Sequence, residues 1–173
     1  MGKILVAYYS WSNGNTKRIA EKVAAAVGAD TIRIETAVPY EGTYDDVVKQ
    51  GKDEVESGFV PEIRLLDKDG NDTSLSLDGY ETVIVGTPTW WYTCAPAVEG
   101  FLKKFDWHGK KVIPFQTHGG WQGNVFSDIG TLCEGAEICL PMAVQFDSSG
   151  GDKQLTLDAD VDLWIKEIVE SIA

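Results

Sequence analysis

The sequence alternates between short apolar runs and longer segments in which apolar residues recur at helical spacing. The apolar runs have the length of strands buried on both faces and occupy residues 4–9, 31–34, 82–86, 111–115 and 136–144. Helical stripes occupy residues 16–27, 97–105 and 160–172. Strands that alternate with helices form a parallel sheet, because right-handed crossovers place the helices on its two faces. The pattern predicts a doubly wound, three-layer α/β/α fold around a five-stranded parallel sheet.

Residues 36–77 do not follow this alternation. Segment 44–57 is predicted to be helical, as is 124–134 further along, whereas 67–78 has the composition of a turn-rich loop. The chain contains no internal repeat, low-complexity tract or Ser/Pro-rich linker. Its 173 residues are enough to bury a sizeable core, and we expect a single domain over residues 1–173.

The composition disfavours several classes of protein. No stretch approaches the roughly 18 apolar residues of a transmembrane helix, so no membrane insertion is expected. The first ten residues, MGKILVAYYS, lack a signal-peptide cleavage pattern and are interpreted as the start of a strand. Cys94, Cys133 and Cys139 form no CxxC pair, which argues against a disulfide framework or a zinc site. We therefore expect a cytoplasmic protein without a metal centre.

The chain is acidic, with 15 basic and 27 acidic side chains and a net charge of −12. This charge repels nucleic acid and anionic membrane surfaces, so neither is expected as a partner. It permits docking on a protein with a basic surface. The alternative is an ordinary acidic soluble protein. Net charge indicates a partner only when a binding site is also known.

In sheets of this kind, ligands bind beyond the carboxyl ends of the strands, where the winding reverses. The stretch after 4–9 consists of Ser10, Trp11, Ser12, Asn13, Gly14, Asn15 and Thr16. Its hydroxyl and amide groups, with the backbone N–H groups at the start of the following helix, suit a single terminal phosphate. Neither a GxxxxGK[ST] loop nor a GxGxxG motif is present. A helix cap within a polar turn is the alternative.

Aromatic residues follow the third predicted strand. The stretch consists of Thr87, Pro88, Thr89, Trp90 and Trp91, and Pro96 lies a few residues further on. Large rings in a loop stiffened by proline offer a flat apolar surface to a ligand. An aromatic interface patch or a loop plug is the alternative.

Glycines follow the fourth predicted strand, in the stretch Thr117, His118, Gly119, Gly120 and Trp121. Glycine lets the backbone approach a planar ligand closely. His118 could donate to a ring oxygen or transfer a proton, or its ring could be satisfied by neighbouring carbonyl groups. Together with the first loop, these residues indicate a flat phosphorylated heterocycle.

The three motifs resemble those of the flavodoxin-like flavoproteins. SWSNGNT is similar to the FMN phosphate loop of that family, commonly S/T-x-T-G-N-T, and GTPTWW and THGG are similar to the loops that flank its isoalloxazine. The resemblance covers the first strand with its loop and then residues 80–172. It implies non-covalent FMN as the cofactor, bound by residues 10–16, 87–91 and 117–120. It also implies the strand order 2-1-3-4-5.

Two features depart from the family pattern. The phosphate loop carries one residue more, Asn13, than the commoner T-G-N-T form. Gly119, Gly120 and Trp121 stand where electron-carrier flavodoxins tend to have an aspartate and a stacking tyrosine.

Aromatic rings and negative charge near a flavin disfavour the addition of further negative charge, so a low redox potential is expected.

The resemblance implies an electron-transfer protein that shuttles electrons between redox partner proteins with basic docking surfaces. An NAD(P)H-dependent FMN or quinone reductase of the same fold is the alternative, so enzymatic activity is left open. Lys17 and Arg18 lie near the site, but no dinucleotide fingerprint supports this alternative. A receiver-type signalling module is disfavoured, because Tyr9-Ser10 and Thr87-Pro88 stand where it needs acidic residues.

Overall fold

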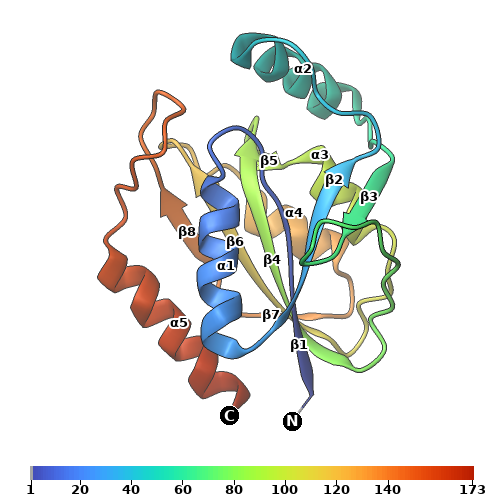
Figure 1. The fold of residues 1–173 in the computed structure, drawn as a ribbon, viewed down its shortest axis with the longest axis vertical. Coiled ribbons are helices and arrows are strands. Elements are labelled where there is room, and N and C mark those ends of the chain that lie inside the picture. Colours follow the sequence, from blue (N-terminus) through green and yellow to red (C-terminus); the bar gives the residue numbers. More distant parts are fainter. Residues whose placement is uncertain (1) are drawn as a thin grey trace.

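The computed structural model describes residues 2–173, over which the chain forms eight strands and five helices (Figure 1). The strands are β1 (Lys3–Tyr9), β2 (Asp30–Thr36), β3 (Ile63–Leu66), β4 (Tyr80–Trp90), β5 (Thr93–Cys94), β6 (Lys111–His118), β7 (Glu137–Ile138) and β8 (Met142–Gln145). The helices are α1 (Asn15–Val27), α2 (Tyr44–Ser57), α3 (Pro96–Leu102), α4 (Val125–Leu132) and α5 (Asp158–Ile172). Among these described helices, none is both long enough and apolar enough to cross a membrane.

The strands form one sheet in the order β3-β2-β1-β4-β6-β7, with β8 also paired to β6 and β5 paired to β4. Pairing is parallel from β2 through β1 and β4 to β6, and β7 and β8 are parallel to β6. The chain passes from β1 outward to β2 and later returns to the other side of β1 as β4. The winding therefore reverses between β1 and β4, and a crevice is expected beyond their carboxyl ends.

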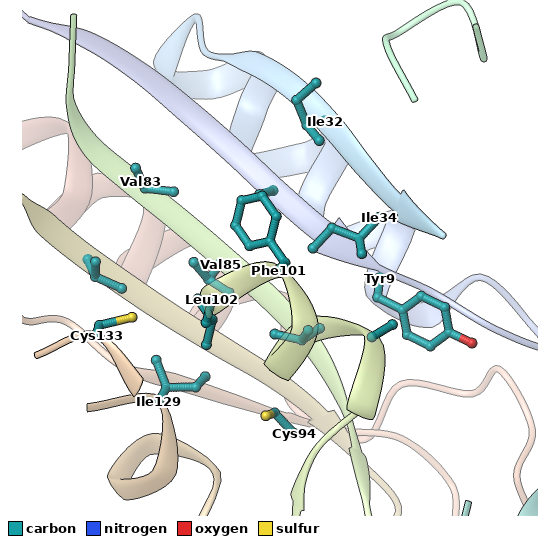
Figure 2. Packing of buried hydrophobic residues seen from close by; sticks show 14 of the residues in the cluster. Tyr9, Ile32, Ile34, Val83, Val85, Cys94, Phe101, Leu102, Ile129 and Cys133 are labelled. Carbon is teal, nitrogen blue, oxygen red and sulfur yellow. The ribbon is translucent and has the colours of Figure 1, made fainter. Parts of the chain in front are cut away.

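Both faces of the central strands are buried. Along β1, Leu5 and Ala7 belong to the core beneath α3 and α4, whereas Ile4 and Val6 belong to the core beneath α1 and α5. Figure 2 shows the first of these cores, in which Phe101 of α3 lies over the sheet. Burial on both sides explains why the strands are continuous apolar runs, and the predicted three-layer α/β/α class is confirmed.

The sheet is larger than the predicted five parallel strands. β3 lies in the segment for which the sequence predicted no strand, and it pairs antiparallel with β2 at the edge of the sheet. The strand predicted at 136–144 is divided into β7 and β8, because Leu140 has a φ of 47° and Pro141 follows it. The indole N–H of Trp164 donates to the Leu140 carbonyl at 2.7 Å, which holds the interruption against α5.

α2 differs in position from the other helices. It begins at a capping box, in which Thr43 Oγ1 accepts from the Asp46 N–H and the Asp46 carboxylate accepts from the Thr43 N–H at 2.8 Å. It ends at Ser57, and the capping residue Gly58 is left-handed. α2 does not cover a face of the sheet but lies beyond the carboxyl ends of the strands (Figure 1). This places a helix at the edge where ligands bind in such folds.

Gly86 of β4 makes room for the buried ring of Phe115 on β6. A methyl group at residue 86 would lie 2.2 Å from Cζ of that ring. We predict that Gly86→Ala lowers the free energy of unfolding by about 1–3 kcal/mol, the usual cost of overpacking a core, as measured by denaturant titration. Gly130→Ala in α4 is the control, because its nearest neighbour would lie 3.9 Å away, and it should not destabilise the protein. Equal losses in the two variants would contradict the prediction.

Candidate functional site

A cavity of about 470 Å³ lies beyond the carboxyl ends of β1, β4 and β6. Its volume is within the range of small-molecule pockets. The residues singled out from the sequence that line it are Trp11, Ser12, Asn15, Thr16, Pro88, Thr89, Trp90, Trp91, Thr117, His118, Gly119 and Trp121. The others, Ser10, Asn13, Gly14, Thr87 and Gly120, are neighbours of lining residues in the chain. The structure therefore brings the three predicted loops to one cavity.

The loop after β1 presents a row of backbone N–H groups. Ser12 and Gly14 have φ values of 60° and 74°, and α1 begins after Gly14 without a side-chain cap. Within residues 2–173, no hydrogen bond is formed by the backbone N–H groups of residues 12–16. Left-handed residues turn successive N–H groups to one side, and the helix dipole adds positive potential there. The loop thus has the donors of an anion site, although none of the described lining residues is lysine or arginine.

The hydroxyl groups of this loop have different roles. Ser10 is buried, and its Oγ accepts from the Lys17 N–H at 3.2 Å, so it supports the first turn of α1. Thr16 Oγ1 and Thr117 Oγ1 share a buried hydrogen bond of 2.8 Å. Ser12 lines the cavity, and its hydroxyl forms no hydrogen bond within the described chain. Ser12 is therefore the hydroxyl most available to a ligand.

Two asparagines join this loop to the loop at residues 146–152. Asn13 Nδ2 donates to the Gly150 carbonyl, and Asn15 Nδ2 donates to the Gly151 carbonyl at 3.0 Å. Asn15 Oδ1, in contrast, is buried and has no hydrogen-bond donor among the described residues. A buried acceptor without a donor is unfavourable, so this oxygen is suited to receive a hydroxyl or N–H group from a ligand.

Asp147 is the acidic residue in the cavity lining, and its charge organises its own loop. Hydrogen bonds from the Ser149 hydroxyl and from the backbone N–H groups of Gly151 and Lys153 hold the pKa of Asp147 below its ordinary value. The carboxylate thereby fixes the carbonyl groups that the two asparagines bind. The 146–152 loop is therefore a second wall of the cavity, joined to the loop after β1 by the two asparagines.

Trp90 joins α2 to the rest of the cavity wall. Its indole meets the rings of Tyr9, Trp11 and Tyr40 edge to face, at centroid distances of 5.9, 6.3 and 5.1 Å. On α2, a methyl group at Gly51 would lie 3.0 Å from this indole, so glycine allows the helix to approach it closely. Trp90 therefore acts mainly as packing between α2 and the sheet.

Trp91 and Tyr92 form the turn between β4 and β5, with positive φ values of 48° and 70°. Such φ values are rare for bulky residues and are usual in two-residue hairpin turns. The turn is held by hydrogen bonds from the Trp91 indole to the Val48 carbonyl at 2.9 Å and from the Asn124 N–H to the Tyr92 carbonyl at 2.7 Å. Trp91 and Tyr92 remain 38% and 57% exposed, so the turn presents aromatic surface at the rim of the cavity.

Two threonines support the same wall from behind. Thr87 is fully buried, and its Oγ1 accepts from the Ala95 N–H at 3.0 Å. Thr89 Oγ1 donates to the side-chain oxygen of Gln116 at 2.6 Å. The first bond fixes β4 to the residue that precedes α3, and the second fixes the end of β4 to β6. Thr87 therefore has a structural role.

Comparison with known proteins agrees with this geometry. A family model described as flavodoxin matches residues 3–166. The chain belongs to the flavodoxin family. Its fold is similar to that of solved proteins from Bacteroides uniformis (28% identity, TM-score 0.74, covering 95% of this chain and 98% of that one) and Bacteroides eggerthii (26%, 0.71, 97% and 98%). It is also similar to a flavoprotein from Lactobacillus acidophilus that was solved in complex with FMN (22%, 0.68, 95% and 99%).

None of the curated proteins gives a significant match to this flavodoxin. The identities to the solved structures are low, although the coverage is nearly complete. The role of each residue is therefore inferred from the geometry of the cavity.

Two parts of the cavity were not among the predicted site residues. α2 contributes Tyr44, Val47, Val48 and Gly51, and the 146–152 loop contributes Phe146, Asp147, Ser148, Gly150 and Gly151. The second part had a signal in the sequence, because FDSSGGD follows the fifth apolar run and so belongs to the same edge of the sheet. The position of α2 had no comparable signal, since an amphipathic helix pattern does not say what the helix faces.

Removal of the Ser12 hydroxyl should weaken binding of a phosphate-bearing flavin. We predict that Ser12→Ala and Ser12→Gly each raise the FMN dissociation constant by the equivalent of about 1–3 kcal/mol, because a hydrogen bond to a charged group is lost. Riboflavin, which lacks the phosphate, should bind all three proteins equally when titrated by fluorescence quenching. Ser127→Ala on the exposed side of α4 is the control. A loss seen in Ser12→Ala and not in Ser12→Gly would indicate backbone strain at the left-handed residue instead.

Proposed function

We propose that this flavodoxin binds FMN non-covalently and transfers electrons between redox partner proteins. The observation that carries the proposal is the row of unpaired N–H groups at residues 12–16, which lies at one end of a cavity walled by aromatic side chains. An anion site beside a flat apolar wall matches a phosphorylated heterocycle.

The residues present fit FMN. The N–H groups of residues 12–16 and the Ser12 hydroxyl would hold the phosphate, and a ribityl hydroxyl would supply the donor that Asn15 Oδ1 lacks. The rings of Trp91 and Trp121 would border the isoalloxazine. Bound FMN supplies the redox chemistry, and the protein tunes it through stacking, hydrogen bonds and nearby charge.

The role of electron carrier is favoured over that of nicotinamide-dependent reductase by the positions of two cations. Lys17 pairs with Glu21 at 3.7 Å, and Arg18 donates to the Asp152 carbonyl at 3.1 Å and lies over the Phe146 ring. Both cations are thus engaged by other groups of the protein, and neither is among the described lining residues. A dinucleotide phosphate would therefore find no cation among the described lining residues. The net charge of −12 suits docking on basic surfaces of protein redox partners.

The two functions differ in their response to nicotinamides. We predict that the FMN-loaded protein stays oxidised for many seconds after stopped-flow mixing with NADH or NADPH, whereas dithionite bleaches it at once. Fast bleaching by either nicotinamide would assign the reductase activity in place of the carrier. A protein that gains no flavin absorbance on titration with FMN would overturn both functions.

A further inference from the structure

His118 is the last residue of β6 and one of the least exposed polar side chains in the cavity wall, at 8% exposure. Its backbone pairs with Gln145 of β8, and its carbonyl accepts from the Phe146 N–H at 2.8 Å. The imidazole therefore projects from a fixed strand end and not from a free loop. A group mounted in this way keeps its orientation toward a ligand.

The protonation state of the ring is fixed by its own loop. His118 Nδ1 accepts a hydrogen bond from the backbone N–H of Gly120 at 3.0 Å. A ring nitrogen that accepts cannot carry a proton, so the neutral imidazole has its hydrogen on Nε2. Gly120 has a φ of 122°, a conformation that residues with a side chain rarely adopt.

The opposite nitrogen is free to donate. Nε2 forms no hydrogen bond within residues 2–173. It is also not one of the buried side-chain atoms that lack a partner among these residues, so it retains some exposed surface. Burial lowers the pKa of His118, and no charged side chain contributes to the shift. The carboxylate of Asp147, in the 146–152 loop, accepts hydrogen bonds from backbone N–H groups of that loop. The ring is therefore neutral at neutral pH, and Nε2–H is the donor that this cavity-lining side chain offers.

We propose that His118 is a fixed, neutral hydrogen-bond donor that selects the ring of the ligand. Its Nε2–H would bind a carbonyl oxygen or an unprotonated ring nitrogen of a flat heterocycle and would reject an edge that presents only C–H or N–H groups. The inference rests on the proposed function and extends it, because it assigns to one side chain the recognition of the heterocycle as distinct from its phosphate. Protonation of Nδ1 would set two donors against each other and release the Gly120 N–H, so the neutral form is part of the site.

The chain contains two histidines, which makes the tautomer directly measurable by ¹⁵N NMR of the imidazoles. We expect the Nε2–H tautomer for His118, with a titration midpoint below 6.5. His108 is the internal control, because its hydrogen bond to Asp106 at 2.7 Å raises its pKa, so it should titrate above 6.5. FMN should shift the ring resonances of His118 and leave those of His108 in place. The Nδ1–H tautomer at His118, or no response when FMN binds, would overturn the inference.

Two substitutions at residue 118 distinguish the effect of the hydrogen-bond donor from the effect of the size of the ring. His118→Phe keeps a planar side chain without a donor and should raise the FMN dissociation constant about three- to tenfold, the loss of one neutral hydrogen bond. His118→Gln keeps an N–H donor and should lose less, and His108→Phe should bind like the wild type. Unchanged affinity in His118→Phe would overturn this inference and leave FMN binding intact. Failure of the wild type to bind FMN would overturn the proposed function as well, and the two failures are thereby distinguished.

Discussion

Burial of the sheet on both faces is the constraint on which the rest of this structure depends. Strand backbones are paired within the sheet, and their side chains fill the two cores beneath the helices, so neither face is left for a ligand. Unpaired backbone groups then remain where strands end and helices begin. The N–H groups of residues 12–16 are at such a place, directly between β1 and α1. The row of unpaired N–H groups is therefore a consequence of the layered fold, and the proposed anion site rests on these groups and not on a cation.

A sheet edge alone is open to water, and two further segments enclose it. α2 closes one side through the contact of Gly51 with the Trp90 indole. The 146–152 loop closes the other side, where it is bound by Asn13 and Asn15. The additional residue of the loop after β1, Asn13, thus has a physical role, because its amide group joins two loops that are distant in sequence. Enclosure of this kind lowers the local dielectric and strengthens each polar contact to a ligand.

The parts of the structure that the sequence predicts are those set by burial and by position at a strand end. The central strands follow from their apolar runs, and α2 has the predicted bounds of 44–57 because its pattern and cap are local. β3 was missed because four residues at a sheet edge, three of them half-buried and one exposed, leave little pattern. The division at Leu140 was missed because its positive φ depends on tertiary contacts, including the bond from Trp164. The placement of α2 over the cavity likewise depends on tertiary contacts, such as that of Gly51 with the Trp90 indole.

The turn at Trp91 and Tyr92 shows how this edge differs from an ordinary hairpin. Asparagine and glycine adopt positive φ at little cost, whereas two aromatic residues do so at a cost on the order of 1–3 kcal/mol each. Such a conformation persists only where the surroundings determine it, and here α2 and the Asn124 N–H bind both turn residues. A methyl group at Gly123 would lie 2.2 Å from the Tyr92 carbonyl oxygen, so the next loop is also shaped around the turn. Two segments, α2 and the loop at 123–124, thus stabilise this strained turn. Its effect is to keep two large, partly exposed rings at the rim of the cavity, which connects the strain to the proposed recognition of a flat ligand.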